Sequence, residues 1–253
     1  MSYTIVEEKE FRYVDVGEGQ PLVLLHGLFG ALSNWQGVID KFKENYRVFI
    51  PILPLYSLPL LNTNVPNLAK YVDKILKFKG IENAVLIGNS LGGHVSLLYI
   101  INHAPKYCGL VLTGSSGLYE NGMGGSYPKR GSYDYIKNKT EETFFNPETA
   151  TKELVDEVFD IVNDRNKIIR VLAMSKSAIR QNLSQDLKVI NQPTLLIWGK
   201  NDIVTPPEVC EEFHKLIPQS EIAWVDRCGH APMMEYPDHF NDILADWLTK
   251  KGL

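Results

Sequence analysis

Residues 84–98 read AVLIGNSLGGHVSLL, and this stretch decides the fold. A continuous apolar run, Ala84–Ile87, is followed at once by a glycine-rich turn and then by a second, longer apolar segment. A short apolar run bounded by turn residues is typical of a strand buried on both faces, as in a parallel sheet covered by helices. The stretch therefore predicts a strand, a tight turn and a helix in immediate succession.

Apolar runs of the same kind recur along the chain and are separated by segments with helical periodicity. We expect strands at 3–6, 11–16, 21–25, 47–50, 84–87, 110–112, 194–198 and 222–225. Helices are expected at 65–76, 91–103, 207–217 and 238–249. This alternation predicts an α/β fold with a mostly parallel, doubly wound sheet. Because ligands bind outside the carboxyl ends of such strands, the residues that follow each strand are the candidates for a site.

One long stretch interrupts the alternation. About eighty residues separate the strand that ends near Thr113 from the one that starts at Thr194, and they contain no obvious buried strand. Their first part is rich in glycine and aromatic residues, and residues 151–180 have a helical pattern. An unstructured loop of this length would be unusual in a compact domain. We predict one core domain, 1–118 and 186–253, with a mostly helical cap inserted at 119–185.

The turn Gly88-Asn89-Ser90-Leu91-Gly92 matches the G-x-S-x-G nucleophile elbow. In that motif a serine occupies a strained turn, so the residues two before and two after it must be small. The N-terminal N–H groups of the following helix favour negative charge that develops near the serine. A glycine-rich turn with an ordinary serine is the alternative, but the flanking strand and helix favour Ser90 as a nucleophile.

A serine nucleophile needs a base, and the base needs a third group that holds it. Asp202 follows the expected strand 194–198, and His230 follows the last expected strand. Each could separately be an ordinary loop residue. Three such residues on three loops after strands, in the order Ser, Asp, His, favour a catalytic triad of Ser90, Asp202 and His230.

Acyl transfer also requires two donors that bind the oxyanion of the tetrahedral intermediate. The backbone N–H of Leu91, the residue after the nucleophile, is one candidate. The other is the N–H of Leu28, in the segment His26-Gly27-Leu28-Phe29-Gly30 that follows an early buried strand. We expect His26 to have a structural role, because His230 already fills the role of the base.

The segments HGLFG (26–30), GNSLGG (88–93), WGKNDIVTP (198–206) and CGHAPMMEYP (228–237), in this order, resemble the α/β-hydrolase superfamily over nearly the whole chain. The resemblance is strongest to small bacterial esterases and to hydrolases that cleave carbon–carbon bonds in meta-cleavage products. It implies that Ser90 attacks a carbonyl carbon, that His230 carries the proton, and that Asp202 orients His230.

Two functions within this family stay open. Asn89 and Asn34 resemble the carbon–carbon hydrolases, which often have a tryptophan after the catalytic histidine where this chain has Ala231. Those enzymes often also have a cap arginine that binds a substrate carboxylate, and the sequence does not place any of the cap arginines in the pocket. The balance favours cleavage of an ester with a small, apolar group. A non-catalytic ligand-binding protein on the same scaffold is the alternative from another class.

We expect substrate contacts from Leu28, Phe29, Leu91, Asn34 and Asn89, no cofactor and no metal. A small molecule is the expected partner.

Composition excludes several other classes of function. The 253 residues include 44% hydrophobic and 22% charged residues, as in an ordinary globular protein, and the formal net charge is −4. Without concentrated positive charge, nucleic acid and anionic membranes are disfavoured as main partners. Three scattered cysteines do not form a disulfide framework. The charged N-terminal stretch and the absence of a long apolar segment predict a cytoplasmic protein without a membrane span, whose oligomeric state the sequence does not reveal.

Overall fold

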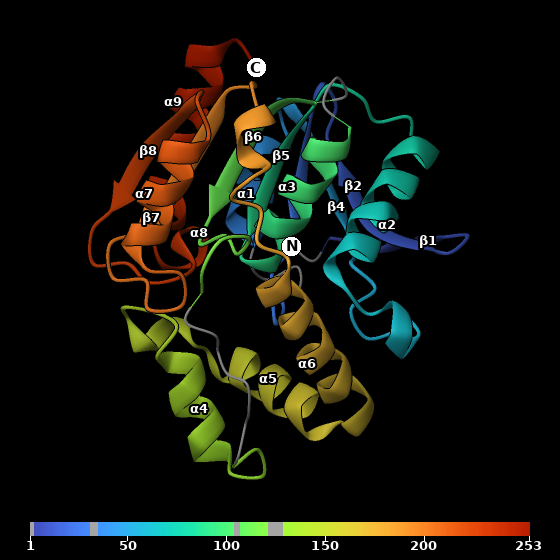
Figure 1. Ribbon diagram of the computed structural model, residues 1–253, viewed down its shortest axis with the longest axis vertical. Helices are drawn as coiled ribbons and strands as arrows, with labels where there is room; N and C mark the ends of the chain where they lie inside the picture. Colours follow the sequence, from blue (N-terminus) through green and yellow to red (C-terminus); the bar gives the residue numbers. More distant parts are fainter. Residues whose placement is uncertain (1–2, 31–34, 104–106, 121–128) are drawn as a thin grey trace.

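Eight strands form one sheet with helices on both of its faces in the computed structural model (Figure 1). The structure describes residues 3–30, 35–103, 107–120 and 129–253. The strands are β1 Val6–Glu8, β2 Phe11–Val16, β3 Gln20–Leu25, β4 Tyr46–Pro51, β5 Ala84–Asn89, β6 Tyr107–Thr113, β7 Thr194–Gly199 and β8 Ser220–Val225. Their order is β1-β2-β4-β3-β5-β6-β7-β8. The β1–β2 and β2–β4 pairs are antiparallel, and the pairs from β4 to β8 are parallel. The predicted mostly parallel sheet is confirmed.

Helices cover both faces of the sheet. They are α1 Gln36–Phe42, α2 Val65–Phe78, α3 Leu91–Asn102, α4 Tyr133–Glu141, α5 Lys152–Asn163, α6 Arg165–Arg180, α7 Pro207–Leu216, α8 Pro232–Glu235 and α9 Pro237–Lys251, with short 3₁₀ helices η2 Leu60–Asn62, η4 Pro147–Thr149 and η5 Leu187–Val189. One core cluster joins the sheet to α2, α3 and α7, and a second joins it to α1 and α9. The central strands are therefore buried on both sides, which explains their continuous apolar sequences.

Local details depart from the expected elements. The first strand, expected at 3–6, is Val6–Glu8, because its register pairs Val6 with Tyr13 across an antiparallel turn. Helices α1 and α4 were not expected, since each is short and few of its residues are buried. The helical stretch 151–180 is two helices. It divides at Asp164, whose Oδ1 accepts hydrogen bonds from the N–H groups of Asn166 and Lys167 and so caps α6.

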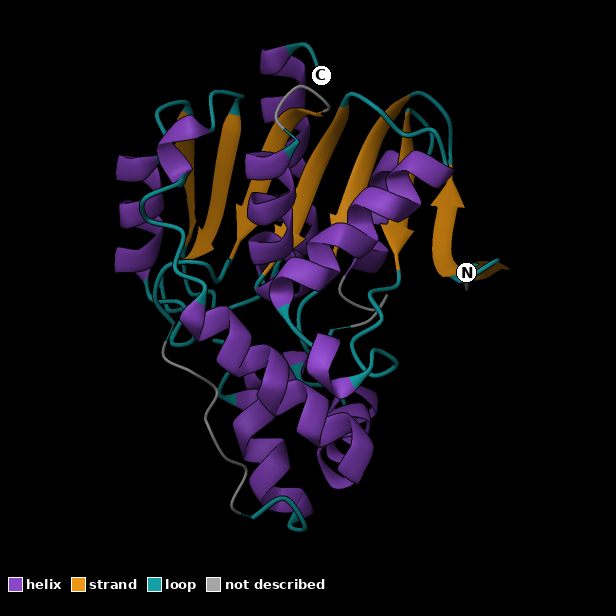
Figure 2. Ribbon diagram, turned by 45° about the vertical axis from the view of Figure 1, so that its right-hand side comes forward, coloured by secondary structure: helices purple, strands orange, loops and turns teal. Residues whose placement is uncertain are grey.

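Helices α4, α5 and α6 lie together beyond the carboxyl ends of the parallel strands, as Figure 2 shows. They share a small apolar cluster of their own, made of Ile136, Val158, Ile161, Val162, Ile168 and Val171. This position agrees with a cap over the site edge of the sheet, although the limits 119 and 185 stay a prediction. In the described ranges no helix is long and apolar enough to cross a membrane.

Candidate active site

Ser90 stands at the turn between β5 and α3 with φ 54° and ψ −119°. A non-glycine residue in this conformation is strained by about 1–3 kcal/mol and persists only where its surroundings hold it. The turn is held by close packing: a Cβ on Gly88 would lie 2.5 Å from the Cα of Gly93, and one on Gly92 would lie 2.0 Å from the carbonyl oxygen of Leu25. Glycine is therefore required on both sides of Ser90, as the motif predicts.

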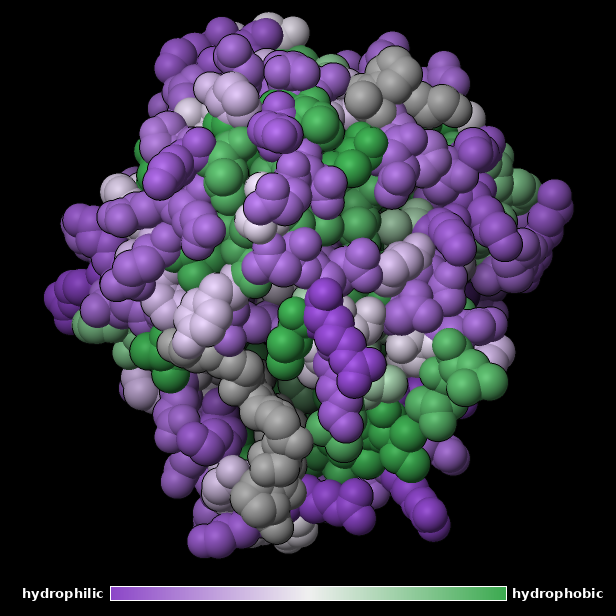
Figure 3. All heavy atoms as spheres, in the orientation of Figure 1, coloured by the Kyte–Doolittle hydropathy of each residue, from purple (hydrophilic) through white to green (hydrophobic). Residues whose placement is uncertain are grey.

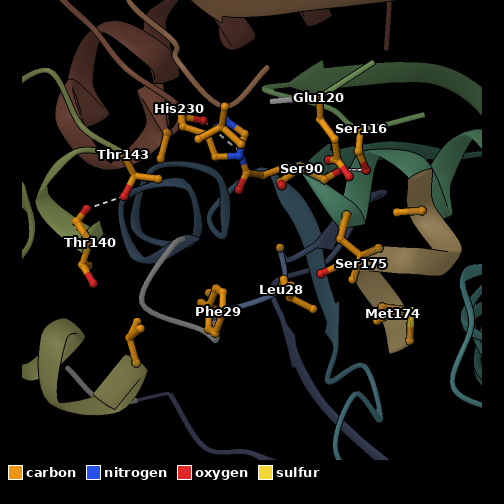
Figure 4. A pocket seen from close by; sticks show the side chains of 18 of the residues that line it. Leu28, Phe29, Ser90, Ser116, Glu120, Thr140, Thr143, Met174, Ser175 and His230 are labelled. Carbon is orange, nitrogen blue, oxygen red and sulfur yellow. Dashed lines mark hydrogen bonds between the residues drawn. The ribbon is translucent and has the colours of Figure 1, made fainter. Parts of the chain in front are cut away.

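Asp202 and His230 form a buried pair. The Nδ1 of His230 lies 2.9 Å from Oδ2 of Asp202. The carboxylate is 2% exposed, and it accepts further hydrogen bonds from Val204 N at 2.8 Å, Thr205 N at 3.0 Å and Thr205 Oγ1 at 2.8 Å. Because a carboxylate only accepts hydrogen bonds, Nδ1 of His230 must donate. The Nε2 of the neutral ring is then unprotonated, and Figure 4 shows this ring turned toward Ser90.

The charge of His230 responds to several groups. Burial lowers the pKa of His230, but the charge and hydrogen bond of Asp202, with contributions from the charges of Glu120 and Glu235, together raise that pKa above its ordinary value of 6.5. The imidazolium form is thus stabilised inside the site, as a residue that takes up a proton during a reaction requires.

The early loop that is expected to donate to the oxyanion is held by two side chains. His26 Nε2 accepts a hydrogen bond from Leu53 N at 3.1 Å, so its Nδ1 carries the proton and donates to the carbonyl oxygen of Gly27 at 2.9 Å. Burial lowers the pKa of His26, which keeps the ring neutral. Tyr56 donates to the carbonyl oxygen of Leu28 at 3.0 Å. These contacts give His26 a structural place in the loop.

The other residues expected to touch substrate differ in their surroundings. Leu28, Phe29, Leu91 and Asn89 line the same pocket as Ser90 and His230. The side-chain amide of Asn89, however, donates to the carbonyl oxygens of Thr113 at 3.0 Å and of His230 at 3.2 Å, so it joins the turn to the histidine loop. Asn34 lies outside the described residues.

The pocket lies between the sheet edge and α4–α6, and its volume is about 180 Å³. Its walls are mainly apolar and include Leu28, Phe29, Leu91, Val158, Met174 and Val204. For comparison, an engineered apolar cavity of about 150 Å³ holds one benzene molecule. Figure 3 shows hydrophobic residues exposed among hydrophilic ones over the lower part of the molecule, where α5 and α6 lie.

Glu120 is a pocket residue that the sequence did not single out. It follows β6 by seven positions (Thr113 to Glu120) and lies in the wall beside Ser116 and Ser90, as Figure 4 shows. Burial raises the pKa of the Glu120 carboxyl, and the charge of His230 opposes that rise. The only available signal was the place of a carboxylate after a strand's carboxyl end.

Glu235 braces the histidine loop. Its Oε1 accepts a hydrogen bond from Gly229 N at 2.6 Å, and its Oε2 accepts from Phe145 N at 2.8 Å and Asn146 N at 3.0 Å. One carboxylate thus joins the loop that carries His230 to the segment that leads from α4 toward α5.

Metal binding finds no support in the side chains that the structure describes, where no group of three His, Cys, Asp or Glu residues is arranged to hold an ion. Ser90 and His230, which is paired with Asp202, thus lie in the wall of one mainly apolar pocket.

Comparison with known proteins agrees with this fold. Residues 22–243 match the model of the alpha/beta hydrolase family. Lipase 3 of Moraxella sp. (strain TA144) is 28% identical over 90% of this chain and 77% of its own length. The 2-hydroxy-6-oxononadienedioate/2-hydroxy-6-oxononatrienedioate hydrolase of Paraburkholderia phymatum is 27% identical over 95% of this chain and 91% of its own.

Among solved structures, the chain resembles MGS-MChE2, an alpha/beta hydrolase enzyme from the metagenome of sediments from the lagoon of Mar Chica, Morocco. The two are 45% identical with a TM-score of 0.82, over 99% of this chain and 100% of the other. The match of a family model to most of the chain, together with this fold, leads to one conclusion: the chain belongs to the alpha/beta hydrolase family.

Proposed function

We propose that this hydrolase is a serine esterase that cleaves carboxylic esters of small, largely apolar acids through an acyl-enzyme on Ser90. The observation that carries the proposal is the His230–Asp202 hydrogen bond of 2.9 Å in a pocket that also contains Ser90. The proposed triad supplies a nucleophile, a base and a group that orients the base.

The proposed reaction begins when Ser90 Oγ attacks the ester carbonyl carbon while His230 Nε2 takes up the hydroxyl proton. The oxyanion that forms would accept hydrogen bonds from the backbone N–H groups of Leu28 and Leu91. Collapse of this intermediate breaks the ester C–O bond, and His230 returns the proton to the departing alkoxide. Water, activated by His230 in the same way, then hydrolyses the acyl-enzyme and frees Ser90.

The apolar pocket walls favour a neutral acyl or aryl group over a charged one. A cavity of about 180 Å³ suits a short chain or a single ring better than a long fatty acyl chain. The lipase relatives agree with ester cleavage as the reaction class, since their name denotes enzymes that act on esters.

Hydrolytic cleavage of a carbon–carbon bond in a dienoate is the second candidate, because several relatives have names of that kind. Such a substrate carries a carboxylate, for which the pocket would need a cation. Arg165, Arg170 and Arg180 are absent from the described pocket lining, and Arg170 donates instead to the carbonyl oxygens of Leu58 at 2.8 Å and Asn166 at 2.9 Å. Two lysines also line the pocket, but Lys139 pairs with Glu142 at 2.6 Å and Lys176 is an exposed residue, so neither replaces a buried arginine, and the lining favours the ester.

Labelling with a fluorophosphonate probe, followed by hydrolysis of p-nitrophenyl esters of graded chain length, tests the proposal. We expect Ser90→Ala to lose both labelling and hydrolysis, and we expect the wild-type rate to be highest for short acyl chains. Equal labelling of wild type and Ser90→Ala would refute Ser90 as the nucleophile. Turnover of a dienoate without turnover of esters would favour the second candidate, and ligand binding without any turnover would favour a non-catalytic protein.

A further inference from the structure

Glu120 is the one acidic side chain among the described residues that line the pocket, whose walls are otherwise mainly apolar. It lies on the side of the pocket that holds Ser90, and Figure 4 shows it beside Ser116. Little offsets the cost of burying its carboxyl group, because within the described ranges that group makes no hydrogen bond or ion pair. A partly buried carboxyl without a partner is costly for a fold to keep. A role toward a ligand would explain why it is kept.

We propose that Glu120 determines substrate specificity by charge: it excludes acyl groups that carry a carboxylate and favours neutral or cationic ones. This inference rests on the proposed esterase function and names its substrate class.

The charged groups near the pocket support this assignment. Burial raises the pKa of Glu120, and the charge of His230 lowers it, so the two groups interact through the pocket. In return, the negative charge of Glu120 raises the pKa of His230. The charge of Glu120 thus reaches the place where a substrate would react.

Two cations also line the pocket, and neither is shown to neutralise Glu120. Lys139 forms an ion pair with Glu142 at 2.6 Å, and Lys176 is an exposed residue of α6. Neither lysine is among the causes of the pKa shift of Glu120. Glu120 is therefore a carboxylate on the Ser90 side of the pocket that neither of these lysines is paired with.

The size of the effect follows from like-charge repulsion. Two carboxylates repel each other more strongly in a partly buried pocket than in open water. We expect this repulsion to lower the binding or rate constant of a substrate that carries a carboxylate by a factor of about 10 to 100. A substrate carboxylate beside the ester carbonyl would meet this repulsion, and a quaternary ammonium group would meet a comparable attraction.

Three p-nitrophenyl esters of similar length test the inference: the butyrate, the hemisuccinate and the 4-(trimethylammonio)butyrate. The butyrate is the reference, because an effect of Glu120 on His230 acts on all three esters alike. Relative to the butyrate, we expect Glu120→Gln to raise kcat/KM for the hemisuccinate about tenfold and to lower it for the cationic ester about tenfold. Glu120→Asp keeps the charge and should keep the wild-type order of the three esters.

A structural role of Glu120 would change the three rates in the same direction, whereas a role through charge changes two of them in opposite directions. Glu153→Gln is the matched control, because it removes one negative charge from an exposed position of α5 outside this pocket. Its effect should be small, since solvent screens an exposed charge.

The outcomes separate this inference from the proposed function. Ser90-dependent hydrolysis with the same charge preference in wild type and Glu120→Gln would overturn the inference and leave the esterase standing. Absence of Ser90-dependent hydrolysis would overturn the esterase. In that case, binding of the three acyl groups as amides to the Ser90→Ala variant, with and without Glu120→Gln, would still decide the charge preference.

Discussion

Replacing Asp202 by asparagine should abolish most of the activity without unfolding the protein. The asparagine side chain has only one oxygen. Oδ1 of Asp202 accepts two backbone N–H groups, those of Val204 and Thr205, so the asparagine oxygen should take that place. The new NH₂ group would then face Thr205 Oγ1 and His230 Nδ1. The Thr205 hydroxyl can rotate so that it accepts a hydrogen bond from this NH₂ group. The His230 ring, however, must move its proton from Nδ1 to Nε2, and a protonated Nε2 cannot take a proton from Ser90.

The magnitude follows from the distance between the two groups. A full negative charge 2.9 Å from Nδ1 of His230 stabilises the imidazolium by about 6 kcal/mol at an effective dielectric constant of 20. Each 1.36 kcal/mol is a factor of ten in rate, so losing this stabilisation lowers kcat by about 10⁴-fold. The His230 tautomer with its proton on Nε2 also lowers kcat.

The assay is hydrolysis of p-nitrophenyl butyrate, with Ser90→Ala as the blank and urea unfolding as a test of the fold. Asp226→Asn is the matched control: its side chain is 77% exposed and pairs with Lys200 at 2.6 Å, so its loss should change kcat by less than about twofold. A loss below tenfold for Asp202→Asn, with the fold intact, would refute the role given to Asp202.

Three further predictions concern pH and stability. Because His230 must be neutral to act as a base and its pKa is raised, kcat/KM should fall at acid pH with a midpoint above 6.5; a flat profile from pH 5 to 8 would exclude His230 as the base. Glu235→Gln leaves either Gly229 or the segment after α4 without an acceptor, so urea unfolding should show a loss of about 1–3 kcal/mol; an unchanged midpoint would contradict the bracing role.

Burial lowers the pKa of His94 to about 4, below its ordinary value of 6.5. As pH falls, His94 therefore takes up a proton in the unfolded chain before it does so in the folded protein. Stability from His94 is therefore fully present above pH 6.5 and falls by about 3 kcal/mol between pH 6.5 and 4. In His94→Gln that part of the pH dependence should vanish. The exposed His239→Gln control should keep it, and equal pH dependence in both variants would contradict the assignment.

Much of the core was readable from the sequence, because its signals are local. The apolar run 84–87 is buried on both faces, so every one of its positions had to be apolar. Gly88 is required by its contact with Gly93 inside the turn, whereas Gly92, which the motif also predicts, is required by its close approach to the carbonyl oxygen of Leu25 on β3. The order of Ser90, Asp202 and His230 on loops after strands predicted their convergence, since parallel strands place their carboxyl ends at one edge. The family resemblance pointed to the same three residues.

Tertiary structure decided what lies opposite Ser90. The wall contributed by α4–α6 depends on how those helices pack on the core, and their amphipathic patterns determine which face is buried but not where it docks. For that reason the sequence could not tell that Glu120 lines the pocket while the cap arginines do not. It also could not show that Glu235 joins the histidine loop to the segment after α4, because that contact spans ninety positions of the chain. The proposed nucleophile and its proposed base follow from local sequence patterns, whereas the charge and shape of the pocket arise from long-range packing.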